Sequence, residues 1–209
     1  MKEYQIGGIQ QVGIGVMNVY EAWKWYIKMF GVDCRIFEDE TEAKLMLPYT
    51  GGKAWSRHAI LALNLQGGSG FEVWQYKGRE PVPIKEEIRL GDTGILVCKV
   101  KVKSIDKAYS NYKLNNAAIP GEPVKGPSGS KSFFVKDPYG NLFQMIEGNH
   151  WFIDEKKETG GSCGVIIGVS DIDRSLPVYS DILDYDEIIY DETGIFPDLA
   201  CLPGGENKF

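Results

Sequence analysis

The chain has 209 residues, of which 43% are hydrophobic and 25% charged, with a formal net charge of -6 at pH 7. This length fits one large domain or two small ones, and the composition is typical of a soluble globular protein. The basic residues form no cluster and no apolar run approaches the ~20 residues of a membrane span, which argues against nucleic acid and membrane partners.

Cysteine and histidine usage limits the metal and redox chemistry that the sequence predicts. The cysteines are far apart and form no C-x-x-C pair, so a zinc ribbon is excluded and reduced thiols are expected. The start of the chain lacks the apolar core of a signal peptide, and a cytoplasmic location is expected. The two histidines, His58 and His150, are too few for a site of several imidazole ligands, and both are expected at a surface or interface. The cysteines are Cys34, Cys98, Cys163 and Cys201.

The first part of the chain predicts the order strand, helix and three strands. A helix is expected over residues 20–30, where apolar side chains recur at helical spacing, with Asn18 as its N-cap and Gly31 as its end. An acidic turn is expected over residues 38–42 and a flexible loop over residues 48–53. Strands are expected over residues 9–16, 34–37, 58–65 and 71–76.

The same order of elements then repeats. Val16 lies seven residues before Trp23 and Val102 lies seven residues before Tyr109, so a strand ends on valine and a helix face begins with an aromatic ring at the same offset. This spacing predicts two related modules. The second has strands over residues 95–102 and near Val124, a helix over residues 106–114 capped by Ser104, and a hairpin over residues 133–147.

The hairpin is the strongest local signal in the chain. An Asp-Pro pair opens a turn and a Gly-Asn pair closes it within residues 137–141, between two apolar runs. In the second run, Leu142, Gln144 and Ile146 share one face because side chains alternate along a strand. Gln144 therefore faces either a lined cavity or a half-buried side of the sheet.

The beginning of a third module is predicted after the second module. Residues 149–161 are predicted to be a linker, and Val169 again precedes an apolar residue, Leu176, by seven positions. Residues 162–209 are therefore expected to begin a further, incomplete module, with half a module leaving an open sheet edge. Either a longer chain completes it, or it pairs with another module or subunit, as in a homodimer. Its predicted elements are a strand over residues 163–169, a helix over residues 172–183 and a strand over residues 186–190.

The repeated order of strand, helix and three strands, with a D-P-x-G-N hairpin near the end of a copy, resembles the vicinal oxygen chelate superfamily. This superfamily includes glyoxalase I, extradiol dioxygenases, methylmalonyl-CoA epimerase and the bleomycin-resistance proteins. The resemblance implies an α+β fold of paired βαβββ modules, each curling a mixed sheet into half a barrel, that face each other across a cleft. The expected domain covers residues 1–148, with modules at about 6–76 and 93–147. The matching motifs are I-x-Q-V-G-I-x-V with W-x-x-Y-x-x-x-F-G (residues 9–31), F-E-V-W-Q-Y (71–76), V-K-S-I-D-K-A-Y (102–109), D-P-x-G-N (137–141) and V-S-D-I-D-R-S-L-x-x-Y-x-x-I-L-D-Y (169–185).

The resemblance also implies where a divalent metal such as Zn, Ni, Mn or Fe would bind. Metal-dependent relatives use His, Glu or Gln on the first and last strand of each module, and these positions carry over to Gln11, Glu72, Val97 and Gln144. Val97 cannot bind a metal, and an amide is a weak ligand for a transition metal. The alternative is that Gln11, Glu72 and Gln144 are polar residues that line a wet cleft or hold an organic ligand without metal.

Two functions follow from the resemblance. One is a protein that binds a small organic ligand in the cleft between the modules, with a degraded metal site, through Gln11, Trp55, Trp74 and Gln144. The other is a metal-dependent lyase or isomerase of the lactoylglutathione lyase kind, with Glu72 as the catalytic residue. An extradiol dioxygenase is less favoured, because its two histidine ligands are missing. Aromatic residues suit the walls of such a cleft, although Trp74 and Phe133 would equally suit a core; the candidates are Trp55, Trp74, Tyr76, Phe133 and Tyr139.

Overall fold

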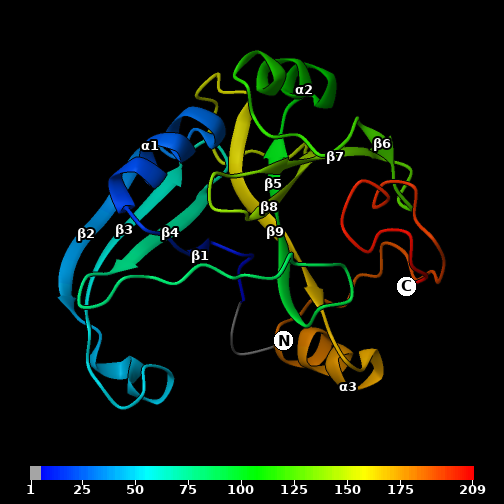
Figure 1. Cartoon of the computed structure of the whole chain (residues 1–209). Coiled ribbons are helices and arrows are strands. Elements are labelled where there is room, and N and C mark those ends of the chain that lie inside the picture. The colour runs from blue at the N-terminus through cyan, green and yellow to red at the C-terminus, as the bar shows by residue number, and fades with distance from the viewer. Residues whose placement is uncertain (1–5) are drawn as a thin grey trace. The chain divides into compact units, whose positions relative to one another are not determined.

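A computed structural model describes residues 6–209, so the first five residues of the predicted domain lie outside the described residues. It has a four-stranded and a five-stranded mixed sheet with few helices, which confirms the predicted α+β class (Figure 1). The chain divides into two compact units. We call Ile9–Lys85 with Asn149–Cys163 the first unit, and Glu86–Gly148 with Gly164–Phe209 the second unit. Within residues 6–209, no helix has the length and apolar character that crossing a membrane requires.

The helix of the first unit, α1 (Val19–Phe30), has the ends that the sequence predicts. The Asn18 side chain accepts hydrogen bonds from the N–H groups of Tyr20 and Glu21, at 3.0 and 3.1 Å. Gly31 adopts φ +65° at the other end, where a residue with a Cβ would be strained. These caps satisfy backbone groups that the helix itself leaves unpaired.

Helix α1 covers one face of the first sheet, and the opposite face carries polar side chains, including that of Glu72. Tyr26 and Phe30 place their rings 5.4 and 5.6 Å from the ring of Phe71, and all three are buried. Because side chains alternate, Glu72 and Trp74 point to the opposite face. The strand order is β1-β4-β3-β2, with β1 parallel to β4 and the other pairs antiparallel. The strands are β1 (Gln11–Gly15), β2 (Cys34–Glu42), β3 (Ser56–Asn64) and β4 (Ser69–Tyr76), and a 3₁₀ helix, η1 (Lys44–Tyr49), follows β2.

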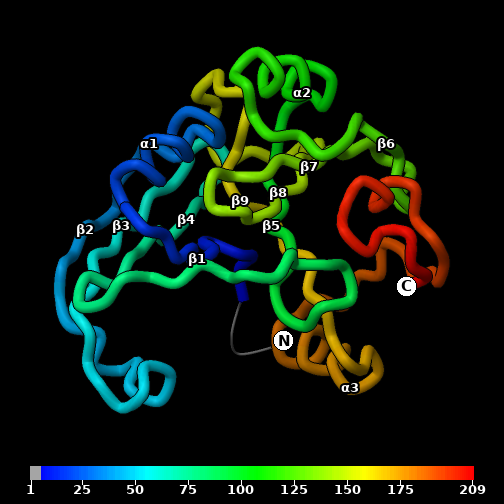
Figure 2. The backbone as a smooth tube through the Cα atoms, in the orientation of Figure 1, coloured from blue at the N-terminus to red at the C-terminus, as the bar shows by residue number. Residues whose placement is uncertain are grey.

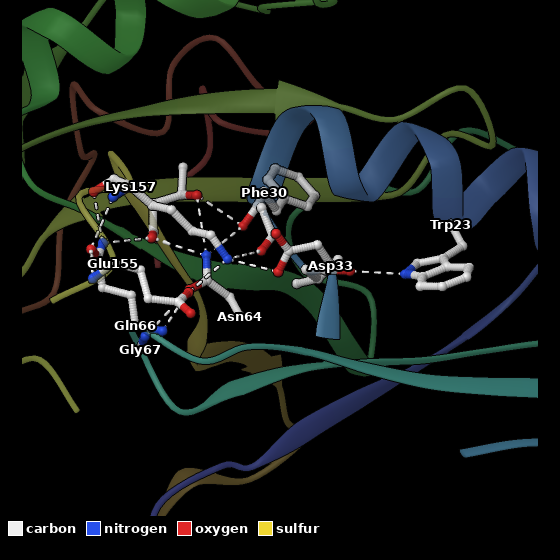
Figure 3. A network of polar contacts seen from close by, with 11 residues as sticks. Trp23, Phe30, Asp33, Asn64, Gln66, Gly67, Glu155 and Lys157 are labelled. Carbon is white, nitrogen blue, oxygen red and sulfur yellow. Dashed lines mark hydrogen bonds and ion pairs between the residues drawn. The ribbon is translucent and has the colours of Figure 1, made fainter. Parts of the chain in front are cut away.

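Within the first unit, two buried amides bind the backbone of Lys157 and Thr159 (Figure 3). Asn64 Nδ2 donates to the carbonyl oxygens of Phe30, at 2.9 Å, and Thr159, at 3.0 Å. Gln66 Nε2 donates to the carbonyl oxygen of Lys157 at 2.7 Å, and Gln66 Oε1 accepts from the Lys157 N–H at 3.0 Å. Side-chain amides thus supply the partners that irregular buried backbone needs.

The second unit repeats the order strand, helix and three strands. Its helix α2 (Ile105–Leu114) packs Tyr109 and Tyr112 against Phe133, with ring centroids 5.3 and 5.9 Å apart. In the turn of the predicted hairpin, Asp137 Oδ1 accepts from two backbone N–H groups and Gly140 adopts φ +92°. The sheet order is β6-β7-β8-β5-β9, with β5 parallel to β8. The strands are β5 (Gly94–Val102), β6 (Val124–Lys125), β7 (Lys131–Lys136), β8 (Leu142–Glu147) and β9 (Thr159–Gly168), the last being divided between the units.

The C-terminal segment, defined here as residues 189–209, covers part of the second sheet. Its Leu202 is 4% exposed and joins an apolar cluster with Val97, Phe134 and Leu142. The segment lies beside β6 in Figure 2, and a Cβ on Gly121 would come within 2.6 Å of the Cys201 Cβ. This face of the sheet is therefore buried by the chain itself.

Three predicted elements differ from the structure. The turn at residues 38–42 is wrong, because β2 continues to Glu42 as an edge strand whose acidic side chains reach solvent while its backbone pairs with β3. The helix predicted over residues 172–183 is α3 (Ile172–Pro177) followed by a π-helical turn, η2 (Val178–Ile182), where Pro177 interrupts the regular pattern. The strand at residues 186–190 is wrong: these described residues form no strand, and Ile188 and Ile189 are exposed.

Leu202→Ala tests the attachment of the C-terminal segment. We expect the free energy of unfolding, measured by urea denaturation, to fall by about 2–5 kcal/mol, because the substitution leaves a cavity in the apolar cluster. Leu45, which is 93% exposed, gives the control: Leu45→Ala is expected to change stability by less than about 0.5 kcal/mol. Equal stability of the two variants would contradict this packing.

Asn64→Asp tests the amide network of the first unit. The variant keeps the size of the side chain but replaces the donor toward the carbonyl oxygens of Phe30 and Thr159 with an acceptor, so we expect a loss of about 3 kcal/mol in urea unfolding at pH 7. Asn111, exposed on α2, is the control, and Asn111→Ala is expected to be nearly neutral. If Asn64→Asp has the same urea midpoint of unfolding as the wild type, the hydrogen bonds of Asn64 do not stabilise the first unit.

Candidate functional site

The uncovered face of the first sheet is open where two glycines lie beside the polar residues. Gly13 pairs in register with Glu72, and Gly15 with Trp74. A Cβ built on either glycine would meet no described atom within 4 Å. The sequence therefore leaves space on this face next to a carboxylate and an indole.

Glu72 is oriented by its neighbour on β1. Gln11 Nε2 donates to Glu72 Oε2 at 3.0 Å, and both residues are partly buried. The structure thus brings together two of the residues that the sequence singles out. A carboxylate held by one amide keeps acceptor capacity for a further donor, since its two oxygens offer about four lone-pair sites.

A pocket of about 410 Å³ lies against Glu72 and Trp74. Arg57 also lines it, and its Nη2 lies 3.2 Å from Asp39 Oδ2. Arg57 Nη1 is buried and has no hydrogen-bond partner within residues 6–209. The pocket therefore combines a carboxylate, a guanidinium with a spare donor, and an aromatic wall. The other lining residues are Gly13, Glu42, Ala43, Lys44, Leu45 and Met46.

Trp55 is not among the residues that line this pocket, although its carbonyl oxygen accepts from the N–H of Ala43, which does line it, at 2.9 Å. Its ring packs so closely on Gly78 that a Cβ there would lie 2.6 Å from the ring, and Lys53 Nζ is 4.0 Å from its centroid. Of the two tryptophans predicted to bind a ligand, Trp74 lines this pocket and Trp55 does not.

The candidate position in the second unit has different surroundings. Gln144 Nε2 donates to Ser132 Oγ at 2.8 Å, while Gln144 Oε1 is buried without a hydrogen-bond partner among the described residues. Val97 of β5, the other position predicted in this unit, is 1% exposed and belongs to the apolar cluster with Leu202. Lys99 is the register neighbour of Gln144 and lines the same pocket, of about 350 Å³.

The predicted ligands do not fit a tightly held transition metal. Gln11 and Glu72 supply one amide and one carboxylate, and the Arg57 cation lines their pocket. Gln144 supplies one amide beside the Lys99 cation. Transition metals in proteins favour imidazole, thiolate and carboxylate ligands. No group of three or more His, Cys, Asp or Glu side chains suited to a metal occurs within residues 6–209.

His58, which was expected at a surface or an interface, is buried within the first unit. It is 7% exposed, and its Nε2 lies 3.0 Å from Glu38 Oε1 on the neighbouring strand β2. The Tyr20 hydroxyl also donates to Glu38. The Tyr20 hydrogen bond, followed by that of His58, holds the pKa of Glu38 below its ordinary value. The burial of His58 could have been predicted from the sequence, because His58 shares one face of β3 with the apolar residues Ile60 and Ala62. His150 is exposed, as expected.

Two residues that the sequence reasoning missed line the pockets, Arg57 and Asp198. Strand alternation could have found Arg57, because it shares the face of Ala59 and Leu61, which pair with Trp74 and Glu72. Asp198 lies outside any regular element, and no local pattern marks it.

The comparisons with known proteins agree with this fold. The model of the Glyoxalase/Bleomycin resistance protein/Dioxygenase superfamily matches residues 8–145. The structure resembles a glyoxalase family protein from Bacillus cereus, with a TM-score of 0.56 and 16% identity over 70% of this chain and 97% of that chain. It also resembles a glyoxalase I variant from Zea mays, with a TM-score of 0.59 and 18% identity over 92% of this chain and 60% of that chain. A second glyoxalase I variant from Zea mays gives a TM-score of 0.53 and 18% identity, over 85% of this chain and 55% of that chain.

No curated protein sequence matches the chain. At identities of 16 and 18%, the structural likeness shows the fold and nothing further about chemistry. The family model matches the region that holds both βαβββ arrangements, from β1 to β8. The protein therefore belongs to the Glyoxalase/Bleomycin resistance protein/Dioxygenase superfamily.

Proposed function

We propose that this protein binds a small organic molecule in the pocket of the first unit. The observation that carries the proposal is the placement of Glu72: Gln11 orients it, and it faces a pocket that Arg57 and Trp74 also line. The volume, about 410 Å³, lies within the usual range for small-molecule sites. Few convergent polar groups beside an aromatic wall are typical of such sites.

The lining groups suggest which molecules fit. Arg57 Nη1 offers a buried donor to a carboxylate, and a guanidinium binds carboxylates strongly. Glu72 accepts from a hydroxyl or an N–H group, and Trp74 offers apolar contact area. An aromatic hydroxy acid supplies all three groups in one compact molecule.

The alternative is a metal-dependent lyase or isomerase of the lactoylglutathione lyase kind. Glu72 favours it, because a carboxylate on the open face at a position where relatives hold metal could act as a base toward a carbon acid. The remaining predicted ligands do not fit a tightly bound metal, which favours the metal-free binding protein. Zn, Ni, Mn and Fe remain the metals to test.

Mandelate tests the binding proposal by isothermal titration calorimetry. We expect saturable binding to the wild type, and Trp74→Ala and Glu72→Gln are each expected to weaken it about tenfold, equivalent to about 1.4 kcal/mol. Trp55→Phe, outside the pocket, is the matched aromatic control and should bind as the wild type does. Binding that is indifferent to Glu72 and Trp74 would place the ligand elsewhere.

Metal content separates the two functions. Protein purified without chelator should contain far less than one transition-metal ion per chain by atomic emission, because only one of the predicted ligands is a carboxylate and the others are amides. For the same reason, its melting temperature should not rise with added Zn, Ni, Mn or Fe. The assay should be paired with isomerisation of the methylglyoxal–glutathione hemithioacetal. A stoichiometric metal that Glu72→Ala removes, together with isomerase activity, would establish the enzyme instead.

A further inference from the structure

The second unit contains a buried amide with an unsatisfied end. Gln144 is 7% exposed and uses Nε2 to donate to Ser132 Oγ at 2.8 Å. Its Oε1 has no hydrogen-bond partner within residues 6–209. A buried acceptor without a donor is destabilising, so such atoms in folded proteins call for an explanation, of which a ligand is one.

A second unsatisfied acceptor comes from the C-terminal segment. Asp198 is 8% exposed, and its Oδ1 also lacks a hydrogen-bond partner in the described part of the chain. Burial raises the pKa of its carboxyl above the ordinary value, against the opposing effect of the Lys99 charge. Gly126 makes room for the carboxylate, because a Cβ there would lie 2.6 Å from Asp198 Oδ2.

Gln144 and Asp198 line one pocket of about 350 Å³, within the usual size range for small-molecule sites. The pocket has apolar and aromatic walls, contributed by Ile146 of β8 and by Tyr190 and Phe196 of the C-terminal segment. Ligand sites in proteins typically combine such walls with a few convergent polar groups.

The wall that carries Asp198 is anchored to the second unit just after Asp198 in the chain. Leu202 is buried in the cluster with Val97 and Leu142, and the Leu90 N–H donates to the Pro203 carbonyl at 2.9 Å. The position of Asp198 therefore follows from packing of the second unit and not from a freely exposed loop.

We propose that this pocket is a second binding site, and that it takes a small organic amine whose N–H groups donate to Gln144 Oε1 and Asp198 while its apolar body contacts the aromatic wall. The site is independent of the binding proposed for the first unit. Two acceptors favour a donor ligand, and the carboxylate favours a positive charge. Lys99 in the same wall disfavours ligands that carry several positive charges.

Benzylamine is the probe, titrated into the ¹⁵N-labelled full chain near neutral pH. We expect saturable shifts of backbone signals from residues 126–132, 144–147 and 196–199. Asp198→Asn keeps the shape of the side chain and removes its charge, and it should weaken binding at least about tenfold, a factor that corresponds to ~1.4 kcal/mol. Gln144→Leu removes the second acceptor and should weaken binding as well, while its melting temperature should not fall, because an unsatisfied buried acceptor is lost.

Matched probes and variants decide the outcome. Benzoate, of similar size and opposite charge, should not shift these signals, and Glu72→Gln should bind benzylamine as the wild type does, which separates this site from the pocket of the first unit. Circular dichroism confirms that each variant is folded, and if Asp198→Asn is not, Gln144→Leu alone decides. No saturation up to about 10 mM benzylamine, near the weak limit of specific binding, would overturn the proposal. So would unchanged binding by the folded variants, or a loss of binding in Glu72→Gln.

Discussion

Each sheet of this protein has two faces, and its helix buries only one of them. In the first unit, α1 covers one face through Tyr26 and Phe30 against Phe71, and in the second unit α2 covers one face through Tyr109 and Tyr112 against Phe133. The other face of a sheet must be buried by further chain or be lined with groups that tolerate water and ligands. Whether further chain covers that second face in each unit determines where a ligand can bind.

The two units treat it differently. The first leaves it open over Gly13 and Gly15, where polar side chains surround a pocket. The second covers it with the C-terminal segment, whose Leu202 packs on Val97, and retains a smaller pocket around Gln144. Val97 therefore has a packing role in the second unit, which accounts for its residue type without reference to chemistry.

Sequence patterns predicted the regular elements well, because local rules determine them. Asn18 and Gly31 mark the ends of α1, and the Asp-Pro and Gly-Asn pairs mark the hairpin. The patterns failed where distant contacts decide: β2 continues past residue 37 because β3 pairs with it, and the apolar run at residues 186–190 forms no strand. For the site, the family resemblance singled out Gln11 and Glu72, which the structure joins by a hydrogen bond, but the contribution of Asp198 depends on tertiary packing that no local pattern encodes.

We propose that Glu72, Arg57 and Trp74 form an organic-ligand site and not a metal site. A crystal structure of the protein with mandelate, recorded with anomalous scattering data in the presence of Ni and Zn, distinguishes the two kinds of site. We expect mandelate density between Arg57 and Trp74, with its hydroxyl toward Glu72 and no anomalous peak at Gln11 and Glu72. An anomalous peak bound by Gln11 and Glu72, or mandelate density away from this pocket, would contradict it.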